Sequence, residues 1–108
     1  MTAVTAKFAF TDLHSFKDYV GFVQLCLPNK FPRREGVAAN AQWTLDLAFD
    51  GLRLGLDLAV REKGERMEFA ESRRLIQEAY NAYKAGNIHA GFTKLELVLK
   101  LLRNVPSQ

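Results

Sequence analysis

The stretch from residue 37 to residue 63 constrains the fold of this chain more than any other part. It reads VAANAQWTLDLAFDGLRLGLDLAVREK and contains no proline. Its charged and amide side chains between Ala41 and Arg61 recur every three or four residues, at Gln42, Asp46, Asp50, Arg53, Asp57 and Arg61. This spacing places them on one narrow side of an α-helix. Because other elements must cover the wide apolar side, the pattern predicts the central helix of a small bundle.

Length and composition are those of one ordinary folded domain. With 108 residues, of which 48% are hydrophobic and 25% charged, the chain can bury a core without a metal or a disulfide. We expect a single helical domain over residues 1–108, with an extended arm over 1–14 and a helical bundle over 15–104. The single cysteine, Cys26, excludes an intrachain disulfide and fits a reducing compartment.

Charge and hydropathy bear on the location and on the class of partner. The net charge of +3 is mildly basic, which gives only slight support to a nucleic-acid partner. The N-terminal residues lack the long apolar segment of a signal peptide, and no run of about 18 apolar residues could span a membrane. We therefore expect a cytoplasmic protein without a membrane partner.

Residues 4–10, VTAKFAF, alternate between apolar and other side chains with a period of two. Val4, Ala6, Phe8 and Phe10 share one side if this segment is extended. One interpretation is an arm that lays its phenylalanines on its own bundle; a second is a strand that pairs with a second copy or with a partner. A helical extension is the third. The sequence shows no second strand in the chain, and a lone strand leaves its backbone groups unpaired.

Three further helices are expected beside the central one, which Gly64 ends. The first covers residues 15–27, with Ser15 as its N-cap and Pro28 closing it. The others cover 66–85 and 88–103, with Gly86 and Asn87 at the turn between them. Because the loops at Gly64 and Gly86 are short, the helices that flank them should be antiparallel neighbours. The fold class that follows is an all-α, four-helix bundle with an extended N-terminal arm.

Helical spacing also predicts which side chains of the last two helices face the core. The helix over 66–85 has a stripe of larger apolar and aromatic residues, Phe69, Ile76, Tyr80 and Tyr83. The helix over 88–103 has a second stripe, Ile88, Phe92, Leu95, Val98, Leu99 and Leu102. Both stripes should be buried between the helices.

Small residues gather on one side of the central helix, at Ala48, Gly51, Gly55 and Ala59. A glycine inside a helix costs about 1 kcal/mol relative to alanine. The close approach of a neighbouring helix would offset that cost. The neighbour can be internal or belong to a second subunit, so these four residues form a candidate helix-packing or dimer seam.

Residues 28–36, PNKFPRREG, form a loop because they contain two prolines, an asparagine and a glycine. Lys30, Phe31, Arg33 and Arg34 make it a candidate anion- or partner-binding site, since paired arginines grip phosphate or carboxylate groups well. The ordinary alternative is a solvated crossover whose Phe31 plugs the end of the bundle.

The run AYNAYKAGNIHAGFTKLELVLKLL is similar to one tetratricopeptide helix hairpin. Gly86 falls at the turn, and Ala79, Gly91 and Val98 fall near small-residue positions. The resemblance covers about a quarter of the chain, and no second repeat follows. Ala82 stands where that family usually has an aromatic residue. A generic αα-hairpin explains the same pattern, so we assign no family.

The sequence contains no recognisable motif for catalysis, for a metal or for a cofactor. His14 and His89 are its only histidines, and neither belongs to a zinc-ligand or nucleophile pattern. No phosphate-binding glycine loop is present. We therefore expect a non-enzymatic helical protein-interaction module that self-associates, as a homodimer, or binds another protein. The alternative is a nucleic-acid-associated or anion-binding regulator that uses the basic loop 28–36.

Overall fold

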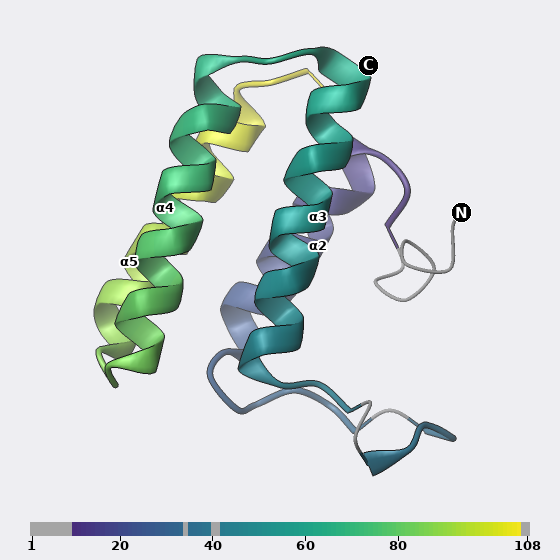
Figure 1. The fold of residues 1–108 in the computed structure, drawn as a ribbon, viewed down its shortest axis with the longest axis vertical. Coiled ribbons are helices and arrows are strands. Elements are labelled where there is room, and N and C mark those ends of the chain that lie inside the picture. Colours follow the sequence, from purple (N-terminus) through teal and green to yellow (C-terminus); the bar gives the residue numbers. More distant parts are fainter. Residues whose placement is uncertain (1–9, 34, 40–41, 107–108) are drawn as a thin grey trace.

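The computed structural model describes residues 10–33, 35–39 and 42–106. These residues form four α-helices and no strand: α2 (Leu13–Cys26), α3 (Leu45–Lys63), α4 (Met67–Lys84) and α5 (Ile88–Arg103). In Figure 1, α3 and α4 lie in the nearer layer and the fainter α2 and α5 in the farther one. Contacts join α4 to α5, α2 to α5, α3 to α4 and α2 to α3. The predicted all-α, four-helix bundle is confirmed.

The hydrophobic core lies between these layers and draws on every described helix. Its largest fully buried helical side chains are Leu13, Phe16, Val20 and Val23 of α2, Phe49, Leu52 and Leu56 of α3, Phe69 and Ile76 of α4, and Leu95 and Leu102 of α5. Two residues outside the helices join them: Phe10 is 1% exposed and Val105 is 0% exposed. The residues just before α2 and just after α5 are therefore anchored in the core.

The central helix begins later than its sequence period predicts. It starts at Leu45, so the predicted start at Val37 is wrong. Thr44 is the reason: its backbone is extended, and its hydroxyl accepts a hydrogen bond from the amide of Leu47 at 3.0 Å. Before this cap, the Gln42 side chain donates to the carbonyl of Val37 at 2.8 Å, a contact within the preceding connection.

The first helix begins earlier than predicted. Asp12, not Ser15, is its N-cap, and the carboxylate of Asp12 accepts from the amide of Ser15 at 2.9 Å. The hydroxyl of Ser15 in turn accepts a hydrogen bond from the amide of Asp12 at 3.2 Å. This is a capping box with the roles of acid and hydroxyl residue exchanged. It lets Leu13 enter the core as the first helical residue.

The remaining helix boundaries lie close to the predicted ones. Gly64, with φ of 84°, follows α3, and Gly86, with φ of 82°, follows α4; glycine adopts such angles at little cost. The last helix has the predicted limits, but the side chain of its N-cap, Asn87, makes no capping hydrogen bond.

Candidate functional site

The small-residue seam of α3 lies inside the bundle. Ala48, Gly51, Gly55 and Ala59 are all buried. A Cβ atom added to Gly55 would lie 2.0 Å from Cε1 of Phe16, so this glycine makes room for an aromatic ring of α2. The hydroxyl of Tyr19 donates to the carbonyl of Ala48 at 3.0 Å. The seam is therefore the place where α2 packs on α3 within one chain.

The basic loop is anchored by its aromatic residue. The Phe31 ring stacks on Trp43, with centroids 5.3 Å apart and an angle of 19° between planes. It also lies 5.8 Å from the ring of Phe22 in α2. Phe31 is half-buried, whereas Lys30 and Arg33 are exposed on either side of it.

This arrangement divides the predicted loop site into two parts. The aromatic ring belongs to the bundle end, and the two described cations project from it. The fourth predicted residue, Arg34, lies outside the described residues, as do residues 1–9 of the predicted arm. Sequence reasoning missed Trp43 as the support of this loop, because the helical period placed it on a face of the central helix.

Charged residues of α3 and α4 pair with one another across the nearer layer. Arg73 contacts Asp57 at 3.0 Å, and Lys84 contacts Asp46 at 3.9 Å. Along α4, Arg74 joins Glu71 and Glu78, and Lys94 of α5 joins Glu78 at 2.8 Å. Such exposed pairs contribute little to stability individually, at about 0–1 kcal/mol each. They form a solvated polar surface.

Tyr80 lies at the edge of the core, where its ring packs against Phe49, but its hydroxyl belongs to this polar surface. It is half-buried, and its hydroxyl donates to a carboxylate oxygen of Asp46 at 2.7 Å. That hydrogen bond raises the pKa of Tyr80. The Arg53 guanidinium lies 5.1 Å from the centre of the ring. Helical spacing identified the correct side of α4, but the edge of that side reaches solvent.

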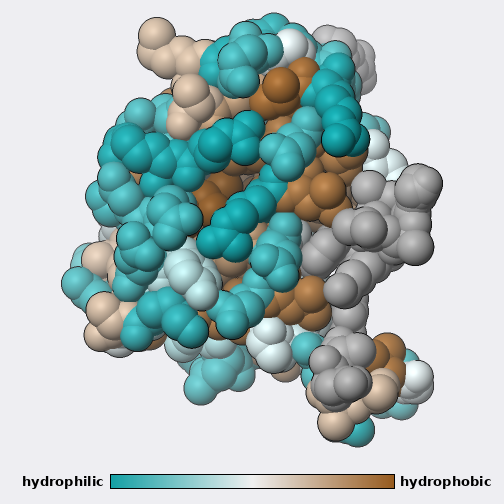
Figure 2. All heavy atoms as spheres, in the orientation of Figure 1, coloured by the Kyte–Doolittle hydropathy of each residue, from teal (hydrophilic) through white to brown (hydrophobic). Residues whose placement is uncertain are grey.

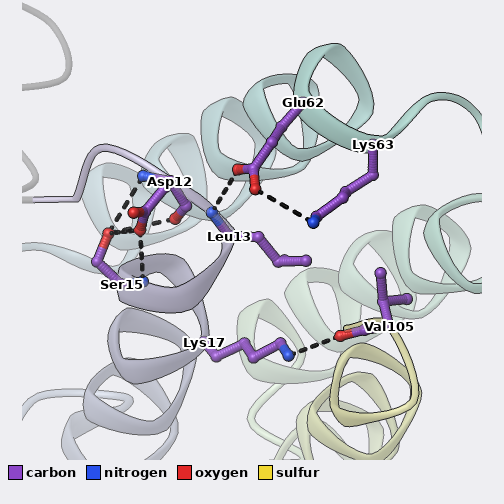
Figure 3. Close-up of polar contacts among 7 residues, drawn as sticks. All are labelled: Asp12, Leu13, Ser15, Lys17, Glu62, Lys63 and Val105. Carbon is purple, nitrogen blue, oxygen red and sulfur yellow. Dashed lines mark hydrogen bonds and ion pairs between the residues drawn. The ribbon is translucent and has the colours of Figure 1, made fainter. Parts of the chain in front are cut away.

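A second polar cluster links the ends of three helices (Figure 3). Glu62 of α3 points toward the first turn of α2, and its carboxylate accepts a hydrogen bond from the amide of Leu13 at 2.9 Å. Lys63 lies 3.6 Å from the same carboxylate. Lys17 donates to the carbonyl of Val105 at 2.8 Å. A carboxylate therefore meets the positive start of α2, and an ammonium meets a carbonyl just after α5.

The charged side chains of this cluster interact with the ends of helices. Partial burial, together with the neighbouring charge of Lys63, lowers the pKa of Lys17. The side chain of Lys63 is 15% exposed. Because each polar group meets a helix end or an opposite charge, the cluster explains how α2 is fixed against α3 and α5. It offers no reacting centre.

Large apolar side chains are exposed where α2 ends and α5 begins. Leu25 is 75% exposed, Phe92 is 42% exposed and Ile88 is 41% exposed. The two helices meet here, because Gln24 donates to the Glu96 carboxylate at 2.8 Å and its Nε2 lies 3.5 Å from the carbonyl oxygen of Phe92. We call Leu25, Ile88 and Phe92 the end patch.

The end patch corrects the predicted core face of the last helix. Leu95, Val98, Leu99 and Leu102 are buried as predicted, but Ile88 and Phe92 are not. They occupy the first turns of α5, where the bundle ends and no neighbouring helix covers them fully. Figure 2 shows the α3–α4 side of the molecule, which is largely hydrophilic with apolar surface where α3 lies.

The residues with reactive side chains do not assemble into a centre. His14 and His89 are exposed on different helices. Cys26 is partly buried, and burial raises the pKa of its thiol, which disfavours the reactive thiolate. Within residues 10–33, 35–39 and 42–106, no group of His, Cys, Asp and Glu side chains could hold a metal ion. No helix in the same ranges is long and apolar enough to cross a membrane.

The chain matches no protein-family model, no curated protein and no solved structure.

Proposed function

We propose that this chain is a small non-enzymatic helical protein-interaction module that self-associates through its end patch. The observation that carries the proposal is the exposure of Leu25, Ile88 and Phe92 on two neighbouring helices at one end of the bundle. Single exposed apolar residues are common on protein surfaces. A group of large ones on adjacent elements favours an interface.

A second copy of the chain is the simplest binding partner for this surface. In a two-fold contact the same patch lies on both sides, so Leu25 and Phe92 of each copy can cover those of the other. Burying one such side chain contributes about 1.5–3 kcal/mol relative to leaving it in water. The exposed fractions of Leu25 and Phe92 leave part of that gain unused in the single chain.

Sedimentation velocity over a range of protein concentrations tests the proposal. The full chain should show a reversible increase in sedimentation coefficient with concentration. Replacing Leu25→Lys together with Phe92→Lys should weaken this association at least tenfold, because the charges cannot be buried in an apolar contact without a large cost. Circular dichroism should show that the variant remains helical, since both residues are exposed.

A matched control uses Met67, which is even more exposed, at 83%, but lies at the start of α4 away from the end patch. Met67→Lys should leave the association unchanged. A strict monomer at millimolar concentration, or equal effects of the Met67 variant and the end-patch variant, would contradict the proposal.

A second candidate function is a nucleic-acid-associated or anion-binding regulator that uses loop 28–36. The observation that favours it is the exposure of Lys30 and Arg33 on a loop that Phe31 fixes to Trp43. Phosphate binding should weaken steeply as salt rises. It should also fall on Lys30→Ala with Arg33→Ala, but not on Lys100→Ala with Arg103→Ala, which removes the same charge from α5. Equal losses in both variants would indicate nonspecific attraction.

A further inference from the structure

Gly21 lies inside α2, yet no contact among the described residues explains a glycine there. A glycine inside a helix is less favourable than an alanine. Gly55 and Gly91 have a clear reason, because a Cβ atom on either would overlap the ring of Phe16 or Tyr83. A Cβ atom on Gly21 would meet no described atom within 4 Å, and Gly21 has no positive φ angle. The backbone of α2 is therefore bare at this position, beside open space.

Two hydrogen bonds show where Gly21 lies on α2. Lys17 donates to the carbonyl of Val105, just after α5, and Gln24 donates to the carboxylate of Glu96 in α5. These donors lie four residues before Gly21 and three residues after it, so Gly21 borders the edge of α2 that faces α5. Gly21 is itself partly exposed. The open space therefore lies at the surface, beside the contact between α2 and α5.

The most exposed residue of the end patch lies one helical turn from this bare backbone. Leu25 follows Gly21 by four residues, which places both on the same side of α2. Leu25 is 75% exposed. One side of α2 thus presents a projecting apolar side chain next to a position that has no side chain. Such a surface is complementary to a second copy of itself, because a two-fold contact makes each pairing twice.

We propose that two copies of the chain pack their α2 helices against each other in antiparallel orientation, with Leu25 of each copy over Gly21 of the other. This proposal rests on the self-association through the end patch proposed above, and it specifies the helix and the register of that contact. A two-fold axis level with Val23 makes both pairings at once. The side chain of one helix then packs into the surface of the other, and the glycine permits the close approach.

Charge complementarity favours a second copy in this orientation. Asp18 is exposed one turn before Gly21, and Lys30 is exposed just after α2, where its amide donates to the carbonyl of Cys26 at 2.6 Å. Antiparallel copies that place Leu25 over Gly21 also bring Asp18 of each copy near Lys30 of the other. Parallel copies in the same contact would instead place like charges together. Charge and shape therefore favour the same arrangement.

Sedimentation velocity of Gly21→Leu tests this contact. If apolar area alone drove association, an added leucine would strengthen it. Under the proposal the leucine fills the space that Leu25 of the other copy needs, so association should weaken at least tenfold. Ala70→Leu, a change from a small residue to leucine at an exposed position of α4, should leave association unchanged. Association of Gly21→Leu as tight as that of the original protein, or tighter, would overturn the proposal.

Gly21→Ala should act in opposite directions on folding and on association. It should raise the urea midpoint at protein concentrations at which the chain is a monomer, because alanine is the better helix former. It should weaken association, although by less than Gly21→Leu. A weaker association can then not be attributed to a less stable fold. Unchanged association in both Gly21 variants would show that the second copy does not contact this position.

Charge reversal tests the antiparallel register. Asp18→Lys and Lys30→Asp should each weaken association, and the double variant should recover it, because the opposite charges meet again with their positions exchanged. A double variant whose loss equals the sum of the two single losses would overturn the register. A strictly monomeric original protein would contradict both this contact and the proposed function. If the Leu25 and Phe92 charges abolish association but Gly21→Leu does not, only this contact is wrong.

Discussion

The α2–α3 and α4–α5 contacts use the same device, a glycine that admits an aromatic ring. A Cβ atom on Gly55 would lie 2.0 Å from Cε1 of Phe16, and one on Gly91 would lie 2.5 Å from Cε2 of Tyr83. The rings differ in chemistry. Phe16 is wholly apolar and 1% exposed, whereas the buried hydroxyl of Tyr83 has no hydrogen-bond partner among the described residues.

The two contacts also differ in how the chain joins their helices. A short turn at Gly86 connects α4 to α5 and holds them antiparallel. A long connection, residues 27–44, separates α2 from α3. Local turn chemistry therefore helps to specify the first pair, while side-chain packing must specify the second. We expect α2–α3 to be the more sensitive of the two contacts to a change in its glycine.

Gly55→Ala should produce the largest loss of stability. The added methyl group overlaps the Phe16 ring, which is fully buried and cannot move into solvent. Overpacking of this kind costs about 1–3 kcal/mol, and it acts against a gain of up to about 1 kcal/mol from the better helix propensity of alanine. Urea denaturation should show a lower free energy of unfolding.

Gly21→Ala is the matched control for that variant. Gly21 also lies inside a helix, but nothing lies within 4 Å of a Cβ atom built on it. Alanine there should raise the free energy of unfolding by about 0.5–1 kcal/mol. Opposite signs at the two glycines are the expected result, and a gain in stability at both would contradict the close contact between Gly55 and Phe16.

Gly91→Ala should also destabilise the protein, but by less, about 1 kcal/mol. The methyl group would meet the edge of the Tyr83 ring. Tyr83 lies in the last turn of α4 and is 5% exposed, so its ring has more freedom to shift than that of Phe16. Urea denaturation measures both variants under the same conditions. A loss larger than that of Gly55→Ala would reverse the ranking of the two contacts.

Tyr83→Phe should stabilise the protein by about 1 kcal/mol, because it removes a polar group that is buried without a hydrogen bond. The same burial raises the pKa of Tyr83. Thermal and urea unfolding both measure the gain, and Tyr80→Phe is the control. That variant removes a hydroxyl bonded to Asp46 and should bring no gain. A loss of stability in Tyr83→Phe would indicate that its hydroxyl has a partner.

The sequence was sufficient for the parts of the fold that depend on local periodicity and turn chemistry. The four helices, with Gly64 and Gly86 as helix ends, follow from spacing and residue type. Spacing could not identify Phe16 as the ring that fills the seam, since that choice depends on how α2 approaches α3. Packing between helices is a tertiary property.

The errors have a common physical origin. The helical period of the sequence continues upstream of Leu45, but Thr44 caps the N-terminus of the helix, so the helix begins at Leu45. Likewise, Ile88 and Phe92 keep the period of a core face although the bundle stops beside them. A period indicates which side of a helix is apolar, but neither where the helix begins nor how far its neighbours extend. The candidate surfaces depend on those ends, so the end patch could not be predicted.

The smallest expected effect concerns how the two helices of the farther layer begin. Asp12 caps α2 by accepting hydrogen bonds from the amide and hydroxyl of Ser15, whereas the Asn87 side chain makes no such bond to α5. These bonds lower the pKa of Asp12 below its ordinary value of 3.8. The charged cap therefore stabilises the folded state at pH values above the ordinary pKa of aspartate. This stabilisation is lost as the pH falls through the lowered pKa of Asp12.

Asp12→Asn tests this difference between the two helix starts. Asparagine can still cap a helix but carries no charge. The variant should have a lower melting temperature than the original protein near neutral pH, and the gap should close as the pH falls below the lowered pKa of Asp12, where both side chains are neutral. Asp18→Asn, an exposed change on the same helix, should show no comparable gap. If the Asp12 gap stays constant down to that pH, the charge of the cap contributes nothing and only its shape matters.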